Sequence, residues 1–179
     1  MPTLLDLYKL IKEDTLPQYI IYCDLDGVLA GFDEGYLTLT GKPTHHADVQ
    51  DKTEFWSTFN RALKDKNISE FKYWAELPWN PGGKQLWDYI SKYNPFILTA
   101  PTRNPESKEG KRVWVANHLD NVKKIYFAYA IYKPQYSRKN RILIDDRKDT
   151  IDAWRAKGGI GIHHTSTTST IKQLKQLGL

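Results

Sequence analysis

Five short and almost wholly apolar segments are spaced along this chain, and amphipathic segments lie between most of them. The apolar segments span residues 18–24, 95–100, 122–130, 141–146 and 159–165. Strands buried on both faces have this nearly continuous apolar character, and alternation with helices favours parallel pairing. The pattern predicts an α/β fold, with a Rossmann-like parallel sheet covered by helices on both faces.

One stretch interrupts this alternation directly after the first predicted strand. Residues 33–79 are polar and rich in tryptophan, with a helical pattern near residues 52–65 and little strand signal. We therefore expect residues 1–32 and 80–179 to form a core domain, and residues 33–79 to form a small inserted helical cap. Apolar residues at helical spacing also predict an N-terminal helix within residues 3–14.

Charge and composition narrow the partners and the location. The net charge is +5 and the isoelectric point is near 9.1, which favours anionic partners such as phosphorylated metabolites, nucleotides or nucleic acid. Cys23 is the single cysteine, so no intramolecular disulfide can form. The first residues interleave charges with apolar residues, and no apolar run reaches membrane-spanning length. We expect a cytoplasmic protein without a membrane partner.

Polar side chains gather where the predicted strands end. Because the carboxyl ends of parallel strands share one edge of a sheet, these side chains should converge there. Carboxylates that cluster repel one another unless a cation lies among them, and oxygen ligands without cysteine or histidine favour Mg²⁺. The acidic and hydroxyl residues at these ends are Asp24, Asp26, Thr99, Asp145 and Asp146. The basic candidates nearby are Lys133, just past the third strand, and Lys139 and Arg141 further along.

The strand ends carry recognisable motifs. DLDGV at 24–28, the apolar strand ending in Thr99, the downstream lysine and ILIDD at 142–146 resemble the four motifs of haloacid dehalogenase-like (HAD) hydrolases, in the same order. The resemblance covers residues 19–165 and implies a role for each carboxylate. Asp24 would be the nucleophile that takes a phosphoryl group. Asp26 would protonate the leaving oxygen and then activate water, while its backbone carbonyl reaches Mg²⁺.

The same resemblance assigns the remaining motif residues. Thr99 and Lys133 would hold the phosphoryl oxygens, and Asp146 would complete the metal site with Asp145 in support. Dehalogenases and ion-pumping ATPases of this superfamily lack an acid at the second aspartate position. Asp26 therefore favours the hydrolysis of phosphomonoesters.

A narrower resemblance involves the cap. DLDGVLAGF at 24–32, EFWSTF at 54–59, ELPWNPGG at 76–83, ILTAPT at 97–102, the K..VW helix and LIDDR at 143–147 resemble the 5'(3')-deoxyribonucleotidases. In that family an aromatic cage holds the nucleobase, and Lys111 matches a lysine on the phosphate side. Ala100 stands where the family usually has a hydroxyl residue, so one donor is lost. The cage and its neighbour would be Phe32, Phe55, Trp56 and Ser57.

Other interpretations of these residues stay open. The aspartate pair could be a strand-end turn, because Asp-Gly is a turn signal. The aromatic residues could form the cap's own small core. A polynucleotide 3'-phosphatase would also suit the motifs, and its partner would be a nucleic acid end. Another small-molecule HAD phosphatase would suit them as well. A non-catalytic nucleotide-binding module is the alternative outside enzymes. Relatives of this kind often form homodimers, but no interface can be identified in the sequence.

Overall fold

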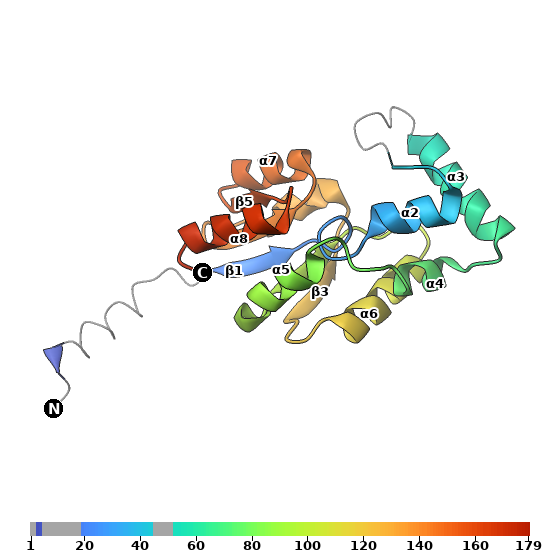
Figure 1. Ribbon diagram of the computed structural model, residues 1–179. Coiled ribbons are helices and arrows are strands. Elements are labelled where there is room, and N and C mark those ends of the chain that lie inside the picture. The colour runs from blue at the N-terminus through green and yellow to red at the C-terminus, as the bar shows by residue number, and fades with distance from the viewer. Residues whose placement is uncertain (1–2, 5–18, 45–51) are drawn as a thin grey trace.

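The computed structural model describes residues 3–4, 19–44 and 52–179 (Figure 1). These residues contain a five-stranded sheet in the order β3-β2-β1-β4-β5. All neighbouring strands are parallel. The strands are β1 (Ile20–Cys23), β2 (Phe96–Thr99), β3 (Lys124–Phe127), β4 (Arg141–Asp145) and β5 (Ile160–His163). The predicted α/β class is therefore confirmed, and each observed strand is shorter than the apolar segment that predicted it.

Helices cover both faces of the sheet, because successive strand residues point to opposite sides. Ile21 and Cys23 of β1 belong to one apolar cluster, together with Leu86 of α5 and Leu174 of α8. Tyr22 lies between them in sequence and packs on the other side against α7. The helices after the cap segment are α5 (Gly83–Ile90), η1 (Ser91–Tyr93), α6 (Glu106–His118), η2 (Ala130–Tyr136), α7 (Lys148–Ala156) and α8 (Thr167–Gln176).

The segment inserted after β1 lies beyond the carboxyl end of that strand (Figure 1). Its helices are α2 (Phe32–Thr40), α3 (Lys52–Asp65) and α4 (Glu70–Ala75). Within the described part of residues 33–79 there is no strand, apart from an isolated bridge between Trp79 and Ala30. The helical character of the segment follows the sequence pattern, while its division from the core domain remains a prediction.

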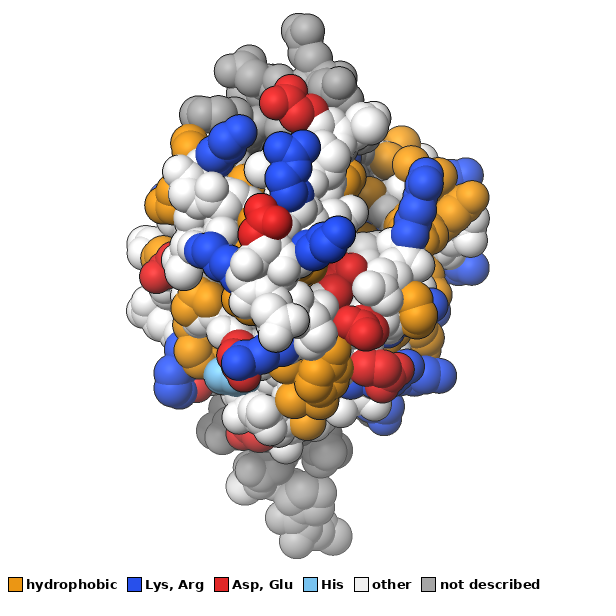
Figure 2. Space-filling view, turned by 90° about the vertical axis from the view of Figure 1, so that its right-hand side faces the viewer, with side chains coloured by type: hydrophobic (Ala, Val, Ile, Leu, Met, Phe, Trp, Pro, Cys, Tyr) orange, Lys and Arg blue, Asp and Glu red, His pale blue; other side chains and the backbone are white. Residues whose placement is uncertain are grey.

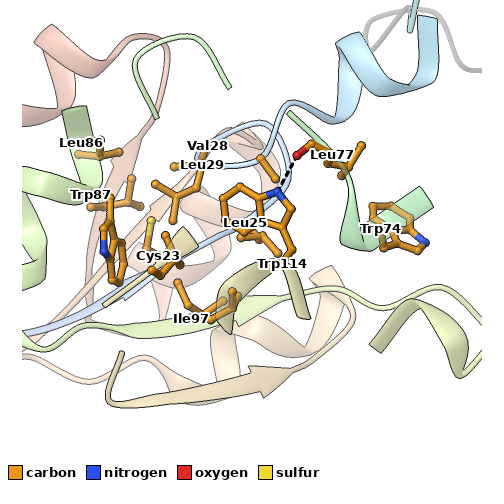
Figure 3. Packing of buried hydrophobic residues seen from close by; sticks show 14 of the residues in the cluster. Cys23, Leu25, Val28, Leu29, Trp74, Leu77, Leu86, Trp87, Ile97 and Trp114 are labelled. Carbon is orange, nitrogen blue, oxygen red and sulfur yellow. Dashed lines mark hydrogen bonds between the residues drawn. The ribbon is translucent and has the colours of Figure 1, made fainter. Parts of the chain in front are cut away.

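The apolar core is continuous from the sheet into the inserted segment. Trp114 of α6 is fully buried, and its indole Nε1 donates a hydrogen bond of 2.7 Å to the carbonyl of Leu77 (Figure 3). Trp74 of α4 belongs to the same cluster as Cys23 and Ile97 of the sheet. Packing of this kind restrains the inserted helices relative to the strand ends, because each fully buried large side chain stabilises the folded state by about 1.5–3 kcal/mol.

Other sequence expectations concern the surface and the N-terminus. The helix predicted within residues 3–14 lies almost wholly outside the described residues. No helix in the described ranges combines the length and apolar character needed to cross a bilayer. Seen from the side of the inserted helices, basic and acidic side chains are interspersed on the surface rather than gathered into one patch of a single sign (Figure 2).

Candidate active site

The turn after β1 presents two aspartates at the edge of the sheet. Asp24 is 5% exposed, and its Oδ1 accepts a hydrogen bond of 2.8 Å from the backbone N–H of Leu25. Gly27 follows with φ of +73°, a conformation that favours glycine. A Cβ at Gly27 would collide with Oδ2 of Asp146. The glycine therefore allows the first and fourth motifs to approach each other.

Lys133 neutralises part of this acidic cluster. Its Nζ lies 2.7 Å from Oδ2 of Asp24 and 2.7 Å from Oδ2 of Asp145. Burial alone would lower the pKa of Lys133, but the two carboxylates outweigh that effect and raise it, so the ammonium stays charged. The residue is 1% exposed, whereas Lys139 lies on the exposed surface. The structure thus brings Lys133, and not Lys139, to the strand ends.

Three carboxylates form a group that fits a divalent cation. Asp24, Asp145 and Asp146 offer oxygens that all lie within 4.8 Å of one another. Burial and the neighbouring Asp24 raise the pKa of Asp145 to about 7, although Lys133 acts in the opposite direction. One ammonium shared by two buried carboxylates leaves negative charge uncompensated, and a hard cation on these oxygens would compensate it.

The second aspartate is held by a different lysine. Nζ of Lys111 pairs with Oδ2 of Asp26, and donates to Oγ1 of Thr99 at 3.1 Å and to the carbonyl of Ala100 at 2.7 Å. Burial raises the pKa of Asp26 against the opposing effect of Lys111. Oδ1 of Asp26 is buried, and no described residue forms a hydrogen bond with it. Asp26 is therefore suited to exchange a proton with a group bound beside it.

A cleft of about 760 Å³ opens over these residues. One wall is aromatic and comes from the inserted segment. Trp56 lines the cleft and is 37% exposed, and its ring meets that of Phe55 edge-on at 5.1 Å. The aromatic residues that line the cleft are Phe32, Phe55, Trp56 and Trp74. A mainly apolar wall facing a few charged groups is typical of a small-molecule site.

The sequence-predicted residues do not all reach this cleft. Asp24, Asp26, Asp146, Lys133 and Ala100 line it, together with the three predicted rings. Thr99, Asp145 and Lys111 are buried behind the surface and contact the lining residues through the bonds described above. Ser57 stands apart, because its hydroxyl donates to the carbonyl of Glu54, at 2.9 Å, on the exposed side of α3.

Comparison with known proteins identifies the fold. No family model matches the chain, and no curated protein matches it. A hydrolase from Streptococcus pneumoniae TIGR4 superposes with a TM-score of 0.52 at 16% identity, over 88% of this chain and 99% of that one. A structure described as a dehalogenase superposes with a TM-score of 0.51 at 14% identity, over 85% and 86%. A haloacid dehalogenase-like hydrolase from Streptococcus pneumoniae also matches, with a TM-score of 0.48 at 17% identity, over 80% and 83%.

The two structures that superpose with a TM-score above 0.5 are described as a hydrolase and a dehalogenase. At these identities the likeness establishes the shared α/β fold. The cleft lies at the carboxyl ends of the strands, which is where ligands bind in open parallel sheets.

Several residues of the site have no counterpart among the sequence predictions. His163 ends β5, and its Nε2 lies 2.9 Å from the backbone carbonyl of Asp146. The backbone N–H of Arg147 donates to Oδ1 of Asp145 at 3.0 Å. Both residues line the cleft. Their positions at strand ends could have identified them, by the rule that located the aspartates. Trp74 carries no such signal, because only the packing of α4 brings it to the cleft.

Proposed function

We propose that this protein is a Mg²⁺-dependent phosphomonoesterase that acts through an aspartyl-phosphate. The observation that carries the proposal is the grouping of Asp24, Asp145 and Asp146 around one edge of the sheet, with Lys133 bridging two of them. Asp24 and Asp145 are both buried and share one ammonium, an arrangement that serves folding poorly because buried charge without full compensation destabilises a fold.

In the first step a carboxylate oxygen of Asp24 attacks the phosphorus atom of the bound ester. The bond between phosphorus and the ester oxygen breaks, and Asp26 gives its proton to the leaving oxygen. The raised pKa of Asp26 favours the protonated form that this step needs. Water then attacks the phosphorus of the aspartyl-phosphate and gives its proton to Asp26. Phosphate leaves and Asp24 returns as a carboxylate.

Positive charge and hydrogen-bond donors around Asp24 would stabilise the phosphoryl group during both steps. Lys133 lies against Asp24, and Lys111 lies against Asp26 and Thr99. Preorganised donors of this kind stabilise charge that develops in the transition state, and removing one costs about 10²–10³ in kcat.

The residues that would hold Mg²⁺ are Asp24 and Asp146, with Asp145 in support and the backbone carbonyl of Asp26 by resemblance. Their oxygen donors and their spacing fit a hard divalent cation. When bound, Mg²⁺ supplies charge that offsets the oxygens of the substrate and the carboxylates.

We propose nucleoside monophosphates, and deoxyribonucleotides in particular, as the substrates. The aromatic wall supports this choice, because bases stack on aromatic side chains with about 1–3 kcal/mol per base. Trp56 is partly exposed at the cleft, and its ring faces there rather than lying wholly in the core. Phe32 and Phe55 also pack on each other, at 6.2 Å, so they serve the cap's packing as well.

The experiment is a phosphate-release assay with Mg²⁺ on a panel of ribo- and deoxynucleoside monophosphates and a generic chromogenic ester. Wild type should release phosphate, chelation of Mg²⁺ should stop it, and Asp24→Asn should abolish it. Asp88→Asn, on the exposed side of α5, is the matched control and should leave release unchanged. If wild type hydrolyses none of these esters, the phosphatase proposal is wrong. A nucleic acid 3' end as the preferred substrate would instead show affinity that falls steeply with salt.

A further inference from the structure

A buried carboxylate outside the proposed chemistry lies behind the aromatic wall of the cleft. Glu70 begins α4 and is 7% exposed. Its Oε1 accepts a hydrogen bond of 3.1 Å from Nε1 of Trp74, and another from Oγ1 of Thr102. No cation among residues 3–4, 19–44 and 52–179 forms an ion pair with it. Burying a carboxylate destabilises a fold unless the carboxylate has partners. The two groups that donate hydrogen bonds to Glu70 therefore indicate what this residue does.

Both of its donors belong to the cleft. Trp74 and Thr102 line it from different elements, α4 and the loop that follows β2. The indole of Trp74 stacks on Phe32 with a centroid distance of 5.4 Å and an interplanar angle of 8°. Nζ of Lys111 lies 4.3 Å from the centroid of the Trp74 ring. Glu70 therefore connects two walls of the cleft and contacts the ring that packs on Lys111.

The backbone of α4 is already restrained by close packing on α6. A Cβ at Gly110 would lie 2.7 Å from Cβ of Trp74 and would collide with the carbonyl of Phe71. The backbone N–H of Phe71 also donates to Glu106, at 3.2 Å. With the backbone held, the orientation of the Trp74 ring is set by its ring contacts with Phe32, Phe59 and Tyr73 and by its hydrogen bond to Glu70. Among these contacts, the hydrogen bond is the one that fixes the direction of the indole N–H.

The Trp74 ring in turn limits where the Lys111 ammonium can lie. That ammonium pairs with Asp26 and donates to Thr99. A cation held over an indole face is attracted by the ring, more strongly when it is desolvated, and Lys111 is 1% exposed. A rotation of the indole would remove this contact from the set that holds the ammonium beside Asp26, and the ion pair with Asp26 and the bonds to Thr99 and Ala100 would then have to hold it alone.

We propose that Glu70 is a positioning residue of this site. It fixes the indole of Trp74, and through that ring it holds the Lys111 ammonium against Asp26. Its action on catalysis rests on the proposed phosphatase function, while its action on Trp74 does not. Glu70 itself touches neither of the two aspartates of the first motif.

The kinetic test uses Glu70→Ala and Glu70→Gln. The alanine variant should lower kcat/KM by about thirtyfold, which corresponds to the loss of a desolvated cation–π contact. It should do so for nucleotides and for the generic ester alike, because Lys111 acts through Asp26, which serves the phosphoryl group common to both. Glutamine keeps a carbonyl oxygen that accepts both hydrogen bonds, so Glu70→Gln should restore nearly full activity. Glu76→Ala, at the exposed end of α4, is the matched control and should change nothing.

A double-mutant cycle separates positioning from simple packing. Trp74→Phe keeps an aromatic ring but lacks the N–H that Glu70 accepts. If Glu70 acts through that N–H, Glu70→Ala in the Trp74→Phe background should lower kcat/KM by less than about twofold, since coupled contacts are non-additive. Equal effects in both backgrounds would overturn the proposal and leave Glu70 a residue of the fold.

A measurement that needs no activity completes the test. In a ¹H–¹⁵N spectrum, the indole N–H signal of Trp74 is the one absent from Trp74→Phe. It should shift and exchange faster with solvent in Glu70→Ala, and stay near its wild-type position in Glu70→Gln. An unchanged signal in Glu70→Ala would refute the proposal even if the protein is an active phosphatase. A shifted signal in a protein without phosphatase activity would refute the proposed function and the catalytic part of the inference, and support only the hold of Glu70 on Trp74.

Discussion

Replacing Lys133 with methionine should destabilise the fold and abolish turnover together. The side chain is 2% exposed, and its ammonium lies 2.7 Å from oxygens of both Asp24 and Asp145. Methionine fills much of the same space but leaves two buried carboxylates without their shared cation. Removing one partner of a buried ion pair costs about 3–5 kcal/mol. The expected loss in the free energy of unfolding is of that size, measured by urea denaturation without Mg²⁺ at pH 8.

The loss should depend on pH in a defined direction. The pKa of Asp145 is raised to about 7 in the fold, above its unfolded value near 4. A raised carboxyl pKa contributes stability below the unfolded value, and that contribution is lost as the pH rises through the folded value. Without Lys133 the pKa of Asp145 should rise further. The difference between variant and wild type should therefore be small near pH 4 and should grow up to pH 7 and beyond.

Two comparisons make this prediction refutable. Lys139→Met removes the same charge from the exposed surface and should change the free energy of unfolding by less than about 0.5 kcal/mol. Mg²⁺ should stabilise Lys133→Met more than wild type, because the cation would lie among carboxylates that have lost their lysine. The reasoning fails if both lysine variants unfold at the same urea concentration, or if Mg²⁺ stabilises neither the wild type nor Lys133→Met.

Three further outcomes follow from the structure. Gly27→Ala should lower the affinity for Mg²⁺, measured by titration calorimetry, because the new Cβ would displace Asp146. The left-handed backbone at this position should also cost the variant about 1–2 kcal/mol of stability. Unchanged affinity would mean that the cation binds elsewhere. Trp56→Ala should raise KM for nucleotides about tenfold and leave KM for the generic ester unchanged, and an equal rise for both would make Trp56 a packing residue. Burial lowers the pKa of His164, whose Nδ1 lies 2.9 Å from Oγ1 of Thr170. The stability of the fold should therefore decrease as the pH drops below about 6.5. His164→Gln should flatten this pH dependence in thermal melts.

The sequence located the acidic residues of the candidate site more directly than the basic and aromatic ones. Asp24 and Asp146 directly follow apolar strands, and parallel topology places the ends of such strands together. Lysines are frequent on any surface, so spacing alone left Lys133 and Lys139 as rivals. Lys133 enters the site because the crossover after β3 is a short 3₁₀ helix that turns its side chain inward between Asp24 and Asp145.

The inserted segment shows the limit of sequence periodicity more sharply. A helical pattern locates α3, but it does not say which face of the helix meets the cleft. Trp56 and Ser57 are neighbours in sequence, yet Trp56 lines the cleft while Ser57 bonds back to its own helix. Successive residues of a helix point about 100° apart, so a contact assigned to one of them does not extend to the next.

The sequence by itself determined the strand and helix alternation, and with it the edge of the sheet where the carboxylates meet, because hydrophobic periodicity is a local property. Only the tertiary structure decided which lysine pairs with which aspartate. It also placed the Trp74 ring against Lys111 and the Glu70 carboxylate against Trp74. Those contacts depend on the approach of α4 to α6 at Gly110, where the missing side chain lets two helices touch. Contacts between residues far apart in the chain depend on such packing, and no local pattern encodes it.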